Sequence, residues 1–300
     1  MGVPIIDSHA HIDFPAFDPD REAMLSRMHQ AGVSDVICIA TDLTGYPRQR
    51  ALAESAPNIW FTTGLHPCYV TDATLATPNS DSATSAPSDS TSTATTKPNP
   101  NPTDPSKAIA TLTTQLKTNT THPRCVAIGE AGLDYYRNAA HKQAQHDIFA
   151  MQLKLATETN LPIIIHARDA DADMEAMLVK ATSQGTLTGV MHCFSSGAQL
   201  AEKALEIGFY ISFSGIVTFK GDKTKALRDI ACAVPQDRLL VETDAPYLTP
   251  EPVRAIKRNE PAHVVHILTY LAELRGEATD ELAQATAANT RRLFWRMQAQ

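Results

Sequence analysis

Short apolar runs rich in β-branched residues recur along the chain, and amphipathic segments with a helical period separate them. The runs expected to form strands are residues 3–7, 35–40, 59–65, 125–129, 162–166, 188–192, 209–213 and 238–243. The segments expected to form helices lie near residues 20–31, 46–55, 107–119, 139–158, 170–183, 197–206, 221–231, 260–275 and 279–296. Strands that are apolar throughout and alternate with helices indicate a parallel sheet covered on both faces.

Residues 71–107 interrupt this pattern. They are mostly Ser, Thr, Pro, Asn, Asp and Ala, and Leu75 is their one sizeable apolar side chain. Such a segment cannot bury enough surface to offset the entropy lost on ordering. We therefore predict a disordered, low-complexity insertion in a loop; a boundary between two domains is the alternative. The same alternation continues on both sides, which favours a single domain over residues 1–300.

The number of strand and helix candidates favours one α/β architecture. Eight strands with at least as many helices predict a (β/α)₈ TIM-like barrel, and without the insertion the chain is close to the ~250 residues typical of that fold. A doubly wound open sheet is the alternative. It is disfavoured because no G-x-G-x-x-G motif follows the first strand.

Composition and charge narrow the possible functions. With 43% hydrophobic and 20% charged residues the chain is expected to be globular. Its apolar runs are far shorter than the ~20 residues of a membrane-spanning helix, so no membrane association is expected. A net charge of −7 excludes nucleic-acid binding through a broad basic surface. Five cysteines without a C-x-x-C pair, and an N-terminus without an export signal, indicate a reducing cytoplasm.

Residue types that bind metal ions follow six of the eight predicted strands at their C-terminal ends. The first strand leads into His9 and His11, which project to the same side of an extended segment and can reach one ion. The H-x-H pair alone is a weak signal and is also compatible with a structural histidine pair. The other strand ends carry His66, Glu130, Asp134, His166, Arg168, His192 and Asp244.

Together these strand ends predict a metal centre. In a barrel they all face the side where active sites lie, and burying so many polar groups without a ligand is costly. Six side chains are more than one tetrahedral site uses, which favours two divalent ions about 3.5–4 Å apart. The predicted ligands are His9, His11, Glu130, His166, His192 and Asp244.

Position along the sheet suggests a role for each ligand. Glu130, on the middle strand of the set, is the natural bridge between two ions. The histidine pair of the first strand would hold one ion, and His166 and His192 the other. Asp244 is predicted to bind the first ion and to accept the proton of a bound water, so Glu130 and Asp244 are the predicted catalytic residues. Histidine ligands suit Zn²⁺ or Mn²⁺, whereas phosphate substrates often bring Mg²⁺.

The motifs around these residues resemble those of TatD-type metal-dependent DNases of the amidohydrolase-like superfamily. The resemblance covers the chain apart from the insertion. It is carried by D-S-H-A-H-I-D at 7–13, G-L-H-P at 64–67, G-E-A-G-L-D-Y-Y at 129–136, I-I-H-A-R-D-A at 164–170, M-H-C-F-S at 191–195, Y-I-S-F-S-G-I-V-T-F-K at 210–220, E-T-D-A-P-Y-L-T-P at 242–250, R-N-E-P at 258–261 and N-T-R-R-L-F at 289–294.

The resemblance implies a barrel with a divalent-metal centre on the same six residues, and phosphodiester hydrolysis of DNA, typically single strands trimmed from the 3′ end. No obligate protein partner is evident. Two rim segments depart from the family pattern: F-S-S-G-A-Q at 194–199 and A-R-D-A-D-A-D-M at 167–174. Neither includes a predicted ligand, so they bear on substrate preference rather than on metal binding.

Further residues have predicted secondary roles. His66 and Arg258 are candidates to bind a substrate phosphate, since arginine offers a fork matched to phosphate. For Asp134 and Arg168 ion pairing is favoured. Packing is favoured for four aromatic residues, of which the first two could also stack on a base: Tyr135, Tyr136, Phe294 and Trp295.

Two other functions stay open. One is hydrolysis of a small amide, lactone or phosphoester on the same metal barrel. Several such enzymes bridge their metals with a modified lysine, and Glu130 at that place favours the nuclease. The other is a non-catalytic barrel whose inserted segment docks a partner, which would leave the metal ligands without a purpose.

Overall fold

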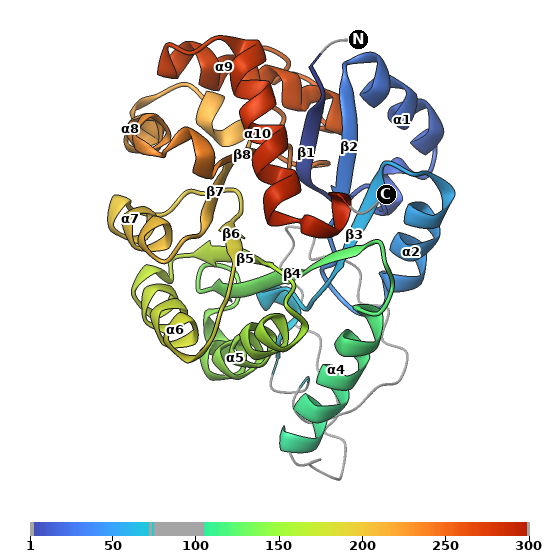
Figure 1. Ribbon diagram of the computed structural model, residues 1–300, viewed down its shortest axis with the longest axis vertical. Helices are drawn as coiled ribbons and strands as arrows, with labels where there is room; N and C mark the ends of the chain where they lie inside the picture. Colours follow the sequence, from blue (N-terminus) through green and yellow to red (C-terminus); the bar gives the residue numbers. More distant parts are fainter. Residues whose placement is uncertain (1–2, 72–73, 75–104, 299–300) are drawn as a thin grey trace.

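An eight-stranded parallel sheet forms the centre of the molecule (Figure 1). The computed structural model describes residues 3–71, 74 and 105–298. Within them the strands follow one another around the sheet in chain order, as a barrel requires. They are β1 (Ile5–Ala10), β2 (Val33–Cys38), β3 (Ile59–Thr63), β4 (Cys125–Asp134), β5 (Ile163–Arg168), β6 (Gly189–Met191), β7 (Tyr210–Phe213) and β8 (Leu239–Val241).

Hydrogen bonds between β1 and the segment after β8 bring the two edges of the sheet together. Ala10 pairs with Ala245 in a parallel bridge. The Asp244 amide donates to the His9 carbonyl at 2.9 Å, and the His11 amide donates to the Ala245 carbonyl at 2.7 Å. These contacts confirm the predicted TIM-like barrel. The alternative of an open, doubly wound sheet is wrong, because a doubly wound sheet leaves both edge strands unjoined.

Helices surround the strands (Figure 1). They are α1 (Arg21–Gln30), α2 (Tyr46–Ser55), α4 (Pro105–Asn119), α5 (Lys142–Thr159), α6 (Asp171–Gln184), α7 (Ala198–Glu206), α8 (Lys225–Ala233), α9 (Val264–Arg275) and α10 (Thr279–Leu293). Most of the predicted insertion lies outside the described residues. Residues 105–107 are the first residues of α4, which begins two residues before the helix predicted over 107–119. No helix in the described ranges has the length and apolarity to cross a bilayer.

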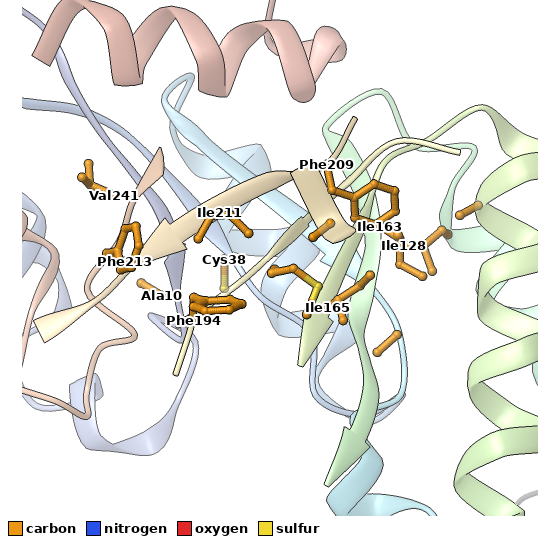
Figure 2. Packing of buried hydrophobic residues seen from close by; sticks show 14 of the residues in the cluster. Ala10, Cys38, Ile128, Ile163, Ile165, Phe194, Phe209, Ile211, Phe213 and Val241 are labelled. Carbon is orange, nitrogen blue, oxygen red and sulfur yellow. The ribbon is translucent and has the colours of Figure 1, made fainter. Parts of the chain in front are cut away.

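Buried side chains of the strands alternate between two clusters, because successive residues of a strand point to opposite faces. Ile163 and Ile165 belong to the larger cluster, which lies between the strands and the helices, whereas Ile164 belongs to a smaller one. All eight strands contribute to the smaller cluster, so it occupies the barrel interior. Figure 2 shows members of the larger cluster, among them Ala10, Cys38, Ile128, Ile163, Ile165, Phe194, Phe209, Ile211, Phe213 and Val241.

The C-terminal segment closes the end of the barrel opposite the predicted site. Phe294 is fully buried and packs with the interior cluster, as predicted. Asn289 of α10 donates to the Leu239 carbonyl at the start of β8, which places this segment at the N-terminal ends of the strands. Trp295 does not pack in the barrel as expected. Its side chain is exposed, and its indole N–H donates to the Asn160 carbonyl at 3.1 Å.

Candidate metal centre

Ionisable side chains from five strands meet at the carboxyl end of the barrel. Strand β1 is longer than predicted and includes His9, with His11 one residue beyond its end. Strand β4 continues to Asp134, so Glu130 lies inside this strand rather than at its end as expected. The structure brings all six predicted ligands into contact with one another: His9, His11, Glu130, His166, His192 and Asp244.

The buried carboxylate of Glu130 stands at the centre of the group. Its Oε1 lies 2.8 Å from Nε2 of His192 and 2.9 Å from Nδ1 of His166. Its Oε2 faces the other histidines, 3.5 Å from Nε2 of His9. Burial alone would raise the pKa of Glu130, but the surrounding histidines outweigh it and hold this pKa well below its usual value. The carboxylate is therefore ionised. One of its oxygens faces His166 and His192, and the other faces His9.

Asp244 lies next to His9 and His11, the two histidines at the end of β1. Its Oδ1 lies 3.4 Å from Nε2 of His11 and 3.6 Å from Nε2 of His9. Burial again opposes ionisation, whereas the hydrogen bond with His11 and the charge of His9 lower the pKa of Asp244. The Asp244 side chain is 15% exposed, compared with 3% for Glu130. It is thus the more accessible of the two carboxylates.

His9 shows that the group is suited to a cation. Its side chain is fully buried, and within the described chain neither ring nitrogen has a hydrogen-bond partner. The nearest carboxylate oxygens, 3.5 and 3.6 Å away, lie beyond ordinary hydrogen-bond distance. Leaving buried polar atoms without partners costs free energy. A metal ion would accept the lone pair of one of these nitrogens.

Three sets of ligand atoms lie within 4.8 Å of one another, which is close enough for a shared ion: His9, His11 and Asp244; His9, Glu130 and His192; and His66, Glu130 and His166. Imidazole nitrogens combined with carboxylate oxygens are ligands of Zn²⁺ and similar divalent ions. The residues present therefore fit a divalent-metal centre.

His66 belongs to one of these sets, but its hydrogen bonds assign it a different role. Its Nδ1 accepts from the Cys68 amide at 3.0 Å, and its Nε2 faces Oε1 of Glu130 at 3.2 Å. Burial lowers the pKa of His66, which favours the neutral ring. A neutral ring whose Nδ1 is an acceptor carries its proton on Nε2. In that state His66 would donate from Nε2 to Oε1 of Glu130 rather than bind a metal.

Carboxylates behind the histidines hold them in place. Oε1 of Glu242 lies 3.1 Å from Nδ1 of His192 and accepts from the Cys193 amide at 2.6 Å. Oδ2 of Asp134 lies 3.0 Å from Nε2 of His166, so the expected ion pairing of Asp134 is with a histidine. Such partners orient metal-ligating histidines. We did not predict the contribution of Glu242; the signal was a second carboxylate two residues before Asp244.

Asp7, a carboxylate whose role we did not predict, joins the first strand to the segment after the last strand. Oδ1 of Asp7 accepts from the Thr243 amide at 2.9 Å, and its Oδ2 accepts from the Thr243 hydroxyl at 2.5 Å. Asp7 lies two residues before His9, and Thr243 directly precedes Asp244. The contact therefore holds ligands of two strands in register.

In the structure, the contacts of Arg258 are with residues outside the group of histidines. Its guanidinium ion-pairs with Asp20 at 2.6 and 2.8 Å and donates to the Ala16 carbonyl at 2.7 Å. It also lies over the ring of Phe17. A role in phosphate binding stays a prediction, and it would require Arg258 to leave this carboxylate.

The two tyrosines after β4 differ in their surroundings. The Tyr135 hydroxyl lies 2.5 Å from both Nε2 of His146 and Oδ2 of Asp173, which ties the loop to α5 and α6. Tyr136 is 66% exposed, and the guanidinium carbon of Arg168 lies 4.0 Å from its ring centroid. Packing was therefore the correct expectation for Tyr135 but not for Tyr136.

Comparisons with known proteins agree with the fold and the centre. The family model of TatD related DNase matches residues 6–295. The metal-dependent hydrolase YcfH of Escherichia coli K12 is 37% identical, over 97% of this chain and 95% of its own length. The 3′-5′ ssDNA/RNA exonuclease TatD of Citrobacter rodentium is 34% identical, over 97% of both chains.

A solved structure extends the agreement to three dimensions. The crystal structure of YJJV, a TatD homolog from Escherichia coli K12, superposes with a TM-score of 0.77 and 30% identity, over 96% of this chain and 97% of that one. The match spans the strands and loops that carry the histidines and carboxylates. The chain therefore belongs to the TatD-related DNase family of metal-dependent hydrolases.

Proposed function

We propose that this protein hydrolyses phosphodiester bonds of nucleic acid, with single-stranded DNA trimmed from its 3′ end as the substrate. The observation that carries the proposal is the position of Glu130, whose two oxygens face different groups of histidines. Two cations bridged by a carboxylate are the arrangement that handles in-line displacement at phosphorus. The Citrobacter rodentium relative is named a 3′-5′ ssDNA/RNA exonuclease, which supports the choice of substrate.

The donor set divides into two parts. His9, His11 and Asp244, whose ligand atoms lie close together, would hold one ion. His166 and His192, which both contact Glu130, would hold the other, with Glu130 shared. When bound, divalent cations such as Mg²⁺, Mn²⁺ or Zn²⁺ would supply Lewis acidity toward a phosphate and lower the pKa of water.

The chain's own residues supply the proton transfers and the polar contacts. Asp244 is ionised at neutral pH and partly exposed, so an oxygen of its carboxylate can accept the proton of the attacking water. The Nε2–H of His66 can donate to a phosphate oxygen at the same centre. Glu130, buried and held by histidines, keeps its negative charge throughout.

Hydrolysis of a small amide, lactone or phosphoester is the second candidate, because the same types of ligand serve those reactions. The carboxylate at the bridging place, where several such enzymes use a modified lysine, favours the nuclease. We also propose that the protein acts in the cytoplasm, since all five cysteines are free thiols and a reducing compartment keeps them so.

A metal-supplemented assay on end-labelled DNA tests the proposal. Wild-type protein with Mg²⁺, Mn²⁺ or Zn²⁺ should shorten 5′-labelled single strands progressively from the 3′ end, faster than the matching duplex, and EDTA should stop the reaction. Asp244→Asn should lower the rate by about 100-fold or more, because it removes the proton acceptor. Asp229→Asn, which removes an exposed carboxylate on α8, is the matched control and should behave as wild type.

Each other outcome has a definite meaning. Shortening from the 5′ end would overturn the polarity, and equal rates on duplex and single strands would overturn the strand preference. Hydrolysis of a cyclic amide, lactone or phosphotriester without cleavage of DNA would establish the second candidate. With none of these substrates hydrolysed under any metal, the barrel would be a scaffold.

A further inference from the structure

A polar cavity of about 470 Å³ opens between the loops that follow β5 and β6. This volume lies within the range of ~300–1,000 Å³ that small-molecule sites occupy. The cavity is lined by Ala167, Arg168, Asp169, Asp171, Ser195, Ser196 and Gly197. The two rim segments 167–174 and 194–199 both contribute to this lining.

The cavity adjoins the metal centre. Ala167 directly follows His166 in the chain, and Ser195 comes three residues after His192. Oδ2 of Asp171 accepts from the Gly197 amide at 2.9 Å, which joins the two loops at the cavity. A group bound there would lie beside a phosphate held at the histidines.

One wall of the cavity offers a flat cationic surface. The guanidinium of Arg168 lines the cavity and lies over the ring of Tyr136. The Tyr135 hydroxyl, bonded to His146 and Asp173, holds the loop that carries Tyr136. Arginine planes and exposed aromatic rings are surfaces on which unpaired bases stack.

The two carboxylates of the lining favour hydrogen-bond donors on the ligand. The carboxylate of Asp169 is exposed and has no hydrogen-bond or ion-pair partner among the described residues. Together with Asp171 it would repel a phosphate group. A carboxylate binds best to two adjacent, parallel N–H donors, as it does with arginine. Among the bases only guanine presents such a pair on its Watson–Crick edge, from its ring N1–H and its exocyclic amino group.

We propose that this cavity binds the base of the nucleotide next to the scissile phosphate and prefers guanine there. Arg168, held against the ring of Tyr136, provides the stacking surface, and Asp169 accepts the two N–H bonds of guanine. The proposal rests on the proposed nuclease function, whose site it extends, and it assigns base preference to the rim of that site.

The test compares two single-stranded oligonucleotides that differ in one amino group. One carries guanine and the other hypoxanthine, which lacks the exocyclic amine, at the nucleotide adjoining the bond cleaved first. Wild-type protein should cleave the guanine strand with a kcat/KM about tenfold higher, the value of one hydrogen bond to a charged group. Asp169→Asn should reduce this ratio to near one, because an amide cannot accept both bonds. Asn also tolerates the positive φ of 54° at this position.

Asp229→Asn, on α8, is the control and should keep the wild-type ratio. Equal rates on both strands with wild-type protein, or an unchanged ratio in Asp169→Asn, would overturn the guanine preference while leaving the nuclease function standing. Absence of cleavage of any oligonucleotide would overturn the nuclease function and this proposal with it.

Arg168 is tested separately, because stacking does not distinguish the two bases. Arg168→Ala should raise KM for both strands by about tenfold and leave their ratio unchanged. Arg168→Lys retains the charge without the flat surface, so it should behave like Arg168→Ala. Full recovery with lysine would show that the residue acts through its charge on a phosphate, and would overturn the stacking role.

Discussion

The histidines of the centre differ in the partner of their second ring nitrogen. Nδ1 of His192 faces the carboxylate of Glu242, which can accept a hydrogen bond from Nδ1–H and so leave the lone pair of Nε2 for a metal. Nδ1 of His66 instead accepts from the Cys68 amide, so that its Nε2 carries the proton. We therefore expect the same side chain to serve as a ligand in one place and as a donor in another, according to one neighbouring group.

Replacing His66 separates these two roles. We expect His66→Ala to retain the metal content of the wild type and to lower kcat by about 100-fold, since it removes a donor to the developing charge on phosphate. His192→Ala is the comparison and should lose metal as well as activity. Metal analysis after dialysis, together with kcat, checks this. A loss of metal in His66→Ala equal to that in His192→Ala would make His66 a ligand.

The carboxylate behind His192 should affect metal affinity rather than folding. Glu242→Gln keeps the shape of the side chain but removes its charge, so His192 is less well oriented and less basic. We expect metal affinity to fall by about tenfold or more, measured by calorimetric titration. The exposed Glu206, changed to Gln, is the control. An unchanged affinity in Glu242→Gln would mean that its contact with His192 does not tune the ion.

At the scale of elements, β4 determines the geometry of the centre. Gly132 of β4 pairs with His166 of β5 and has a φ of +146°. A Cβ added there would lie 2.0 Å from the His166 carbonyl oxygen. The close approach of the two strands brings Glu130 and Asp134 of β4 to His166. A larger residue at Gly132 would thus push apart the strands that carry the ligands.

Two glycines with positive φ allow the cost of crowding to be compared with the cost of backbone strain. Gly208 has a φ of +87° and nothing within 4 Å of an added Cβ. We expect Gly208→Ala to cost only the strain of the left-handed backbone, about 1 kcal/mol of unfolding free energy. Gly132→Ala adds a clash and should cost about 3 kcal/mol or more, with loss of bound metal. Urea unfolding of both variants measures the difference; similar costs would show that the strands move apart without penalty.

At the scale of the whole molecule, the net charge is negative, and two ionised carboxylates lie at the candidate metal centre. The net charge is −7, and the carboxylates of Glu130 and Asp244 are ionised at the carboxyl end of the barrel. Bound cations would add positive charge at this end, where a phosphate would bind. Substrate capture therefore depends on the metal centre and a few side chains around it.

This charge distribution predicts weak and local binding of DNA. Fluorescence anisotropy with wild-type protein and a labelled single strand whose linkages resist hydrolysis should show that affinity falls when EDTA removes the metal. The slope of log affinity against log salt should be shallow, about −2 or less in magnitude, because few phosphates are contacted. Affinity that is unchanged by EDTA, or a steep salt slope, would instead indicate an extended basic surface.

Short stretches of the sequence are enough to predict the barrel, the order of its strands and the six residues of the candidate centre. Apolar runs mark the strands, and a polar residue such as His166 or His192 marks where a strand reaches the active face. The family motifs contain the same local information.

The partners of these residues could not be predicted, because closure of the barrel joins parts of the chain that are far apart in sequence. Asp7 and Thr243 are 236 residues apart and meet only where the first strand joins the segment after the last. No partner of Arg258 could be identified from the sequence, because Asp20 comes to lie beside it only in the folded chain. Local periodicity places a residue on a face of its element; which group it meets there depends on the packing of whole elements.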